Sequence, residues 1–153
     1  MSAAALAERP DLRRVPAREW PALLTEHHRS GLTGLLDCEI VRLEPSRAEG
    51  RLELRDALML RTGHPLHGGT VVALADSCAG WGCLATLPEG RTGFATSGLT
   101  ASLVGSASVP DALVCLATLL HGGRTTQVWD ALVTRESDGR AVAHFRATQH
   151  LLG

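Results

Sequence analysis

A His-Gly-Gly triplet followed by one aspartate is the part of the sequence best suited to chemistry. The triplet ends at Gly69, and Asp76 is the only charged residue between Thr70 and Pro88. Glycines at the start of a helix leave backbone N–H groups free to bind an anion or to polarise a carbonyl oxygen. Such donors, combined with a carboxylate inside an apolar helix, are typical of acyl chemistry. A carboxylate that only caps a neighbouring element or pairs with an arginine is the alternative.

The residues around Asp76 are predicted to form a buried helix from about residue 68 to 84. Apolar residues occur on all sides of this segment, while Gly80, Gly82 and the central aspartate argue against a membrane span. Gly68 and Asp76 are eight residues apart, which is about 12 Å along one helix at about 1.5 Å per residue. One substrate carbonyl cannot touch both groups. We therefore expect a homodimer in which Asp76 acts with Gly68 of the second subunit.

The composition favours a single globular domain. The chain has 153 residues, 44% of them hydrophobic, with a net charge of −1 and no basic run, which excludes a disordered chain and argues against a nucleic-acid partner. The N-terminus has no basic region before an apolar core, so no signal peptide or membrane partner is expected and the protein is placed in the cytoplasm. Four cysteines without CxxC spacing are expected to be reduced core residues: Cys38, Cys78, Cys83 and Cys115.

The order of the predicted elements indicates one α+β domain over residues 16–153, preceded by a flexible N-terminus at 1–15. A helix is expected from residue 16 to about 29, and a turn at 31–34. Strands are expected at 35–43 and 48–54 before the buried helix, and at 92–104, 113–121, 125–135 and 141–151 after it. Because the helix is apolar nearly all round, one long antiparallel sheet must wrap around it.

This order, together with the HGG-x6-D spacing that ends at Asp76, resembles the hotdog-fold acyl-CoA thioesterases of the PaaI-like, phenylacetate-degradation type. The resemblance covers about residues 20–152 and includes Trp129-Asp130-Ala131 in the last hairpin. It implies a sheet wrapped around the helix, pairing of two domains into a homodimer, and often a homotetramer. It also implies hydrolysis of an acyl-CoA or acyl-carrier-protein thioester, with no cofactor beyond the substrate's own coenzyme A. Asp76 would attack the thioester or activate a water, while the Gly68 N–H polarises the carbonyl.

The sequence departs from that family at auxiliary positions. Arg61 stands where many relatives have an asparagine, and Ala95 stands where many have a serine or threonine beside the carboxylate. Thr96 or Ser97 would substitute, although strand alternation points Thr96 to the opposite face from Ala95. These changes leave three alternatives open: a specialised thioesterase, a non-hydrolytic acyl-thioester enzyme such as a dehydratase, hydratase or tailoring enzyme, and a non-catalytic acyl-CoA-binding module.

Several residues near the helix start are candidates for substrate binding. His67 and Gly69 lie at the helix mouth, and His64 is expected to line the pocket. Arg124 lies where the phosphates of coenzyme A often run in the resembling family, or else it is a solvated turn arginine. Arg61 either plays a similar part or pairs with the catalytic carboxylate, which would lower the pKa of that group.

Other chemistries are disfavoured by what the sequence lacks. The adjacent His27 and His28 would point in different directions on a helix, and the histidines at 64 and 67 have no third ligand nearby, so no metal is expected. No GxSxG motif is present, and no cysteine has a base beside it in sequence. Trp81 and Leu84 either line an apolar acyl tunnel or belong to the core.

Overall fold

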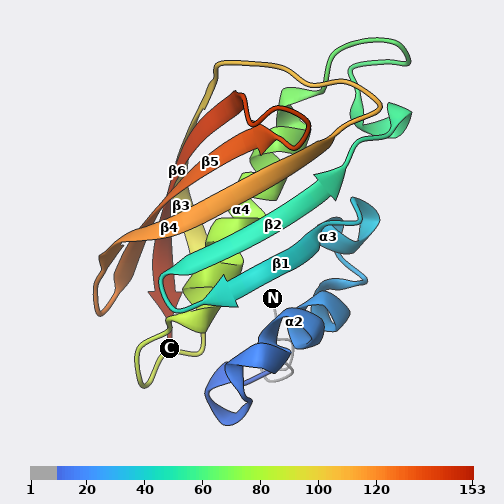
Figure 1. Cartoon of the computed structure of the whole chain (residues 1–153). Helices are drawn as coiled ribbons and strands as arrows, with labels where there is room; N and C mark the ends of the chain where they lie inside the picture. Colours follow the sequence, from blue (N-terminus) through green and yellow to red (C-terminus); the bar gives the residue numbers. More distant parts are fainter. Residues whose placement is uncertain (1–9) are drawn as a thin grey trace.

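A six-stranded antiparallel sheet curves around one long helix in the computed structural model, which describes residues 10–153 (Figure 1). The spatial order of the strands is β1-β2-β4-β5-β6-β3, and every neighbouring pair is antiparallel. The strand bounds are β1 Glu39–Glu44, β2 Arg47–Glu53, β3 Gly93–Leu103, β4 Ala112–Gly122, β5 Thr126–Arg135 and β6 Ala141–Leu152. This arrangement confirms the predicted hotdog fold.

The long helix α4 (Gly68–Ala85) lies on the inner face of the sheet and forms the centre of the core. Side chains alternate along each strand, so the inward positions of β4, β5 and β6 are mostly apolar and pack against it, with Gln127 and Gln149 as buried polar exceptions. Gly82 allows the close approach, because a Cβ at this position would overlap the buried ring of Trp129. Within residues 10–153, no helix has both the length and the apolar character needed to cross a membrane.

The N-terminal helices lie beside β1 at one edge of the sheet (Figure 1). They are α2 (Trp20–His28) and the single turn α3 (Leu32–Leu35), preceded by short 3₁₀ turns at 12–14 and 17–19. Of the segment predicted to be flexible, residues 1–9 lie outside the described residues. Residues 10–15 are packed, because Leu12 is buried and the Trp20 indole N–H donates to the Leu12 and Val15 carbonyls at 2.9 and 3.0 Å.

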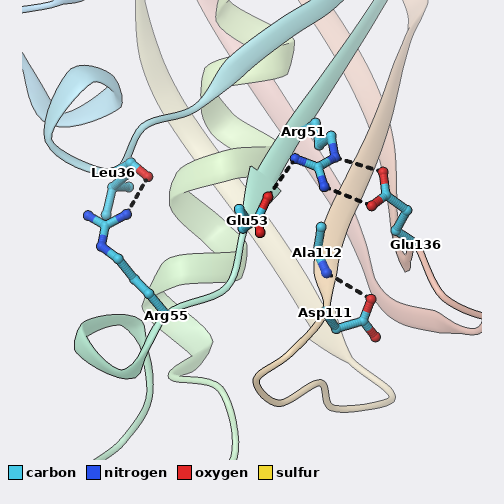
Figure 2. Close-up of polar contacts among 7 residues, drawn as sticks. All are labelled: Leu36, Arg51, Glu53, Arg55, Asp111, Ala112 and Glu136. Carbon is cyan, nitrogen blue, oxygen red and sulfur yellow. Dashed lines mark hydrogen bonds and ion pairs between the residues drawn. The ribbon is translucent and has the colours of Figure 1, made fainter.

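The region between α2 and β1 differs from its prediction. Residues 32–35 form α3 rather than a turn, and the strand expected from residue 35 begins only at Glu39. Asp37 has a φ of 58°, a left-handed conformation that ends the helical turn before the strand starts. Arg55 fixes this segment by donating to the Leu35 and Leu36 carbonyls at 2.8 and 3.1 Å, the second of which Figure 2 shows.

An ion pair ties together strands on the outer face of the sheet (Figure 2). Arg51 on β2 donates to both carboxylate oxygens of Glu136, just after β5, at 2.7 and 2.8 Å, and to Glu53 at 3.1 Å. This pair spans β4, which lies between β2 and β5 in the sheet. It lies outside the core and leaves the inner face apolar.

All four cysteines are buried free thiols, as the sequence predicts. Burial raises the pKa of Cys38 to about 11 and the pKa of Cys83 to about 12. Burial also raises the pKa of Cys78, which lies fully inside the core. Since the thiolate is the reactive form of cysteine, these three side chains are unsuited to act as nucleophiles.

Candidate active site

Asp76 lies in the middle of α4, half-buried on the side of the helix that faces β3. Its Oδ1 atom accepts a hydrogen bond of 3.0 Å from the Thr96 hydroxyl. Burial raises the pKa of Asp76, and the Thr96 hydrogen bond opposes that effect. Burial disfavours the ionised carboxylate, whereas the hydroxyl stabilises it. Asp76 therefore takes up a proton at a higher pH than an exposed aspartate does.

The residue beside the carboxylate is Thr96, one of the two substitutes that the sequence analysis named, and not the residue at position 95. Ala95 is exposed on the opposite face of β3, so it is not the counterpart of the family's hydroxyl residue. Alternation between Ala95 and Thr96 is as predicted, but the inward face is the one that carries the threonine. Ser97 lies at a register shift between Thr96 and Gly98 and is exposed, and its hydroxyl donates to the Thr148 carbonyl at 3.2 Å.

The start of α4 presents one backbone N–H without an acceptor. His67 is the N-cap, and its Nδ1 atom accepts the Gly69 N–H at 2.9 Å. The Thr70 N–H donates to the His67 carbonyl at 3.0 Å. The Gly68 N–H has no hydrogen-bond acceptor among residues 10–153. The helix mouth therefore offers Gly68, rather than Gly69, as a donor at the positive end of the helix dipole.

The loop and turn residues predicted to bind substrate lie apart from Asp76. Arg61 is exposed and forms no ion pair with Asp76 in the described part of this chain, and no charged group contributes to the pKa shift of that carboxylate. His64 lines a cavity of about 680 Å³ beside the helix mouth, which Arg135 also lines. Arg124 is exposed on the turn after β4, where its carbonyl accepts from Arg91, near the C-terminal end of α4. Across residues 10–153, no three His, Cys, Asp or Glu side chains cluster to hold a metal.

A cavity of about 160 Å³ opens directly beside Asp76. Helix α4 contributes most of its wall. Strand β3 contributes the ring of Phe94, and the N-terminal helices α2 and α3 contribute His28 and Thr33. The sequence analysis left open whether Trp81 and Leu84 line a tunnel or belong to the core; both line this cavity, and Trp81 is also part of the core. The remaining lining residues are Asp76, Ser77 and Gly80.

The sequence analysis missed Gln149, a fully buried residue of β6 in contact with the site. Its Oε1 atom lies 2.9 Å from the Thr96 hydroxyl oxygen, and its Nε2 atom has no partner within residues 10–153. A signal for it exists in the sequence. Ala143, Phe145 and Ala147 point inward by alternation, and the same alternation carries residue 149 into the core.

Comparison with known proteins agrees with this fold. The thioesterase superfamily matches the chain over residues 64–142. A 1,4-dihydroxy-2-naphthoyl-CoA hydrolase of Listeria monocytogenes is 32% identical over 109 residues, which cover 71% of this chain and 85% of that protein. The solved structure of Escherichia coli PaaI, from the phenylacetic acid degradation operon, matches with a TM-score of 0.77 at 20% identity, covering 90% and 96% of the two chains. Streptococcus mutans smu.793, solved with acetyl-CoA, matches with a TM-score of 0.68 at 25% identity, covering 76% and 89%. The chain therefore belongs to the thioesterase superfamily, as a thioester hydrolase with a PaaI-like hotdog fold.

Proposed function

We propose that this protein hydrolyses acyl-CoA thioesters, with Asp76 as nucleophile or general base and the Gly68 N–H of a second subunit as oxyanion donor. The observation that carries the proposal is the half-buried Asp76 carboxylate, whose hydrogen-bond partner is a hydroxyl. The unbonded Gly68 N–H at the start of the same helix supplies the second element. Coenzyme A as the thiol is supported by the name of the Listeria relative and by the acetyl-CoA bound to the Streptococcus mutans neighbour.

The proposed reaction needs no group beyond these two and water. Attack on the thioester carbonyl produces a tetrahedral oxyanion, which the Gly68 N–H and the helix dipole stabilise. If Asp76 attacks, coenzyme A leaves as the thiolate and water then cleaves the mixed anhydride. If Asp76 is the general base, it removes a proton from the attacking water, and the thiolate leaves in the same way. Both routes release one free acid and one free thiol, and both require the ionised carboxylate.

Strand β3 supports the homodimer that the eight-residue spacing requires. It is an edge strand of 11 residues, and its outer edge pairs with no strand among residues 10–153. Two of its leucines are largely exposed, Leu99 at 48% and Leu103 at 53%. A long edge strand with exposed apolar side chains is a template for pairing with another chain. We expect β3 to pair with β3 of a second copy, which makes one continuous sheet.

The same pairing brings the two catalytic groups together. Thr96, which bonds Asp76, lies in the first half of β3. Leu103, at the other end, touches the helix mouth, because its Cδ1 is 2.7 Å from where a Cβ on Gly68 would lie. Antiparallel pairing about a two-fold axis near the strand centre sets the first half of one β3 against the end of the other. Asp76 of each subunit then faces Gly68 of its neighbour.

Release of free thiol from a panel of acyl-CoA substrates, with Asp76→Asn measured in parallel, tests the hydrolysis. Turnover by the parent that is lost in a folded Asp76→Asn variant supports the proposal. A folded variant that is as fast as the parent on every substrate refutes the role of Asp76. An intact thioester with an altered acyl chain indicates a dehydratase or hydratase instead, and binding without turnover indicates a binding module.

Mixing two inactive variants tests whether the groups come from different subunits. Gly68→Pro removes the proposed donor, and Asp76→Asn removes the proposed base. A heterodimer of the two contains one site with both defects and one site with neither, so activity returns after the subunits exchange. If both groups of a site came from one chain, each site would keep a defect and the mixture would stay inactive. Light scattering on the parent checks that the dimer exists.

A further inference from the structure

The cavity beside Asp76 has the size of one small acyl group. Its volume is about 160 Å³, close to the roughly 150 Å³ of an engineered protein cavity that binds benzene. We propose that this cavity is the acyl-binding site and that it limits the acyl group to a single six-membered ring or a short chain of similar size. This assignment rests on the proposed function, since it takes Asp76 as the group at which the thioester carbonyl reacts.

The chemistry of the wall fits an apolar acyl group. Trp81, Leu84 and Phe94 supply its larger apolar surfaces. The two hydroxyls that line it are already engaged, because Ser77 donates to the Ala73 carbonyl at 2.6 Å and Thr33 donates to the His28 carbonyl at 3.4 Å. Asp76 therefore marks the polar, reacting end, and the surface beyond it favours a hydrocarbon.

Two features hold the aromatic walls of the cavity in place. Phe94 packs over Gly80, where a Cβ would lie 2.8 Å from the Phe94 Cζ atom, so the helix and the ring leave no slack between them. Trp81 is 3% exposed and belongs to the core, so it cannot swing away without opening the packing. We expect that a two-ring or long acyl group fits between these walls only if Phe94 or Leu84 moves.

The test compares kcat/KM for butanoyl-, hexanoyl-, benzoyl-, lauroyl- and 1,4-dihydroxy-2-naphthoyl-CoA with the full-length protein. We expect the hexanoyl and benzoyl substrates to be at least about 10-fold better than the lauroyl and naphthoyl ones, the discrimination that a missing or extra methylene produces in an apolar pocket. Equal rates across the panel, or a preference for the large groups, overturn the assignment. If the protein hydrolyses the large substrates as well, but Asp76→Asn abolishes that hydrolysis, the size limit is overturned and the proposed function is supported. No thiol release from any substrate overturns both.

Enlarging the cavity gives the second arm of the test. Phe94→Ala and Leu84→Ala are made separately, so that one folded variant suffices, and each should shift the lauroyl-to-hexanoyl ratio toward lauroyl by about 10- to 200-fold. Leu119→Ala is the matched control, since Leu119 packs partly buried against the same core without lining the cavity. An unchanged ratio in the two cavity variants, or an equal shift in the control, overturns the assignment.

A different observation concerns the buried Gln149 amide behind Thr96. As placed, the Gln149 Oε1 and the Asp76 Oδ1 both face the Thr96 hydroxyl, at 2.9 and 3.0 Å, while the Gln149 Nε2 lacks a partner within residues 10–153. A hydroxyl carries one proton and cannot donate to both oxygens. Turning the amide over removes the conflict at Thr96, because the Nε2–H then donates to the hydroxyl oxygen. Amide oxygen and nitrogen are assigned from such networks.

The geometry assigns Gln149 as a positioning residue: its amide N–H holds the Thr96 oxygen and commits the Thr96 proton to Asp76. Gln127, opposite Gln149 in the register of β5 and β6, shows what a purely structural buried glutamine looks like. Its Nε2 donates to the Thr86 carbonyl at 3.0 Å, and its Oε1 accepts from the Trp129 indole at 2.9 Å. The amide of Gln127 is therefore fully hydrogen-bonded to core residues, whereas the amide of Gln149 contacts Thr96 in the site.

The pH profile of kcat/KM separates these roles. Gln149→Met and Gln149→Leu should move the acid limb to higher pH, since a loose Thr96 hydroxyl stabilises the carboxylate less. A double variant that combines Gln149→Met with Thr96→Val should have the same acid limb as Thr96→Val alone, because Gln149 acts through the Thr96 hydroxyl. Gln127→Met should cost stability without moving the limb. His28, the other titratable side chain lining the cavity, is unchanged in every variant. An unmoved limb in folded Gln149 variants, or the same shift in Gln127→Met, overturns the assignment.

Discussion

Replacing Gly68 with proline removes one backbone N–H and leaves the helix start in place. Gly68 is the first residue of α4, where an N–H has no acceptor inside the helix and proline is well tolerated. The preceding His67 has a ψ of 128°, within the extended region that a residue before proline prefers. The substitution therefore deletes the proposed oxyanion donor without requiring a new backbone conformation at His67.

The expected loss in kcat is about 10²- to 10³-fold, the usual effect of deleting one oxyanion donor. The proline ring also brings a Cβ, which would lie 2.7 Å from the Leu103 Cδ1 atom. That atom is the end of a flexible side chain and can move aside. Gly68→Ala is the matched control, because it adds the same Cβ against Leu103 and keeps the N–H. The difference between the two variants isolates the donor.

Thiol release measured over a range of substrate concentrations is the assay, with urea denaturation to confirm that both variants fold. An oxyanion donor acts in the transition state, so kcat and kcat/KM should fall together while KM changes little. A folded Gly68→Pro enzyme with the kcat of Gly68→Ala would refute the reasoning. A rise in KM alone would show that the Gly68 N–H binds ground-state substrate.

Further predictions concern the carboxylate and its surroundings. Burial raises the pKa of Asp76 above that of an exposed aspartate, so the stability of the parent should fall as the pH rises from the ordinary aspartate pKa through the raised one. The stability of Asp76→Asn should not fall over this pH range, so the variant should be the more stable chain at neutral pH. Urea denaturation below and above this pH range measures the difference. In the parent, kcat/KM should drop as acid protonates Asp76. Thr96→Val removes the bond that lowers this pKa, so the acid limb should move to higher pH, whereas Ser97→Ala, which loses only a bond to a backbone carbonyl, should leave it in place. His67→Ala deletes the N-cap bond to the Gly69 N–H and should cost about 1 kcal/mol of unfolding free energy in the same denaturation assay.

The long helix could be predicted from the sequence because every local signal agrees there. Two glycines and a capping side chain begin it, apolar residues fill it, and Pro88 follows soon after its end at Ala85. The structure begins this helix at Gly68, as predicted. The later strands are equally consistent, since their alternation and the turn at Ser137-Asp138-Gly139 specify the same hairpin. Elements with agreeing signals are predictable from one chain.

The segment before β1 could not be predicted because its signals are short and ambiguous. An apolar pair at Leu35 and Leu36 fits a strand or a single helical turn equally well. Tertiary contacts decide the outcome, because Arg55, which is 20 residues away from Leu35 in sequence, bonds both of their carbonyls. Loop residues such as Arg61 show the same limitation. Its pairing with Asp76 was chemically reasonable, yet no contact along the chain brings the two together.

The error at Ala95 has a different origin. Alternation tells which residues of a strand share a face, but it does not tell which face is inside. Strict alternation in β3 places Phe94 on the face of Thr96 but Leu99 and Leu103 on the face of Ala95, so hydrophobicity gives no answer. The inward face follows from pairing with β6, which includes a register shift between Thr96 and Gly98. That pairing sets Thr96 directly opposite Gln149. Alternation along β6 alone points Gln149 inward, but its contact with Thr96 follows only once this pairing is known.

The separation of Gly68 and Asp76 along one helix is the same in the sequence analysis and in the structure, and it determines how a site can form. Helix α4 is continuous from Gly68 to Ala85, so the eight residues between Gly68 and Asp76 keep the two groups about 12 Å apart at about 1.5 Å per residue. A thioester carbonyl bonded to both must therefore meet them on different helices. Strand β3 touches both positions, through Thr96 at one and Leu103 at the other. In the proposed dimer, pairing two copies of this strand would exchange the positions across the symmetry axis, so that assembly and catalysis would both depend on β3.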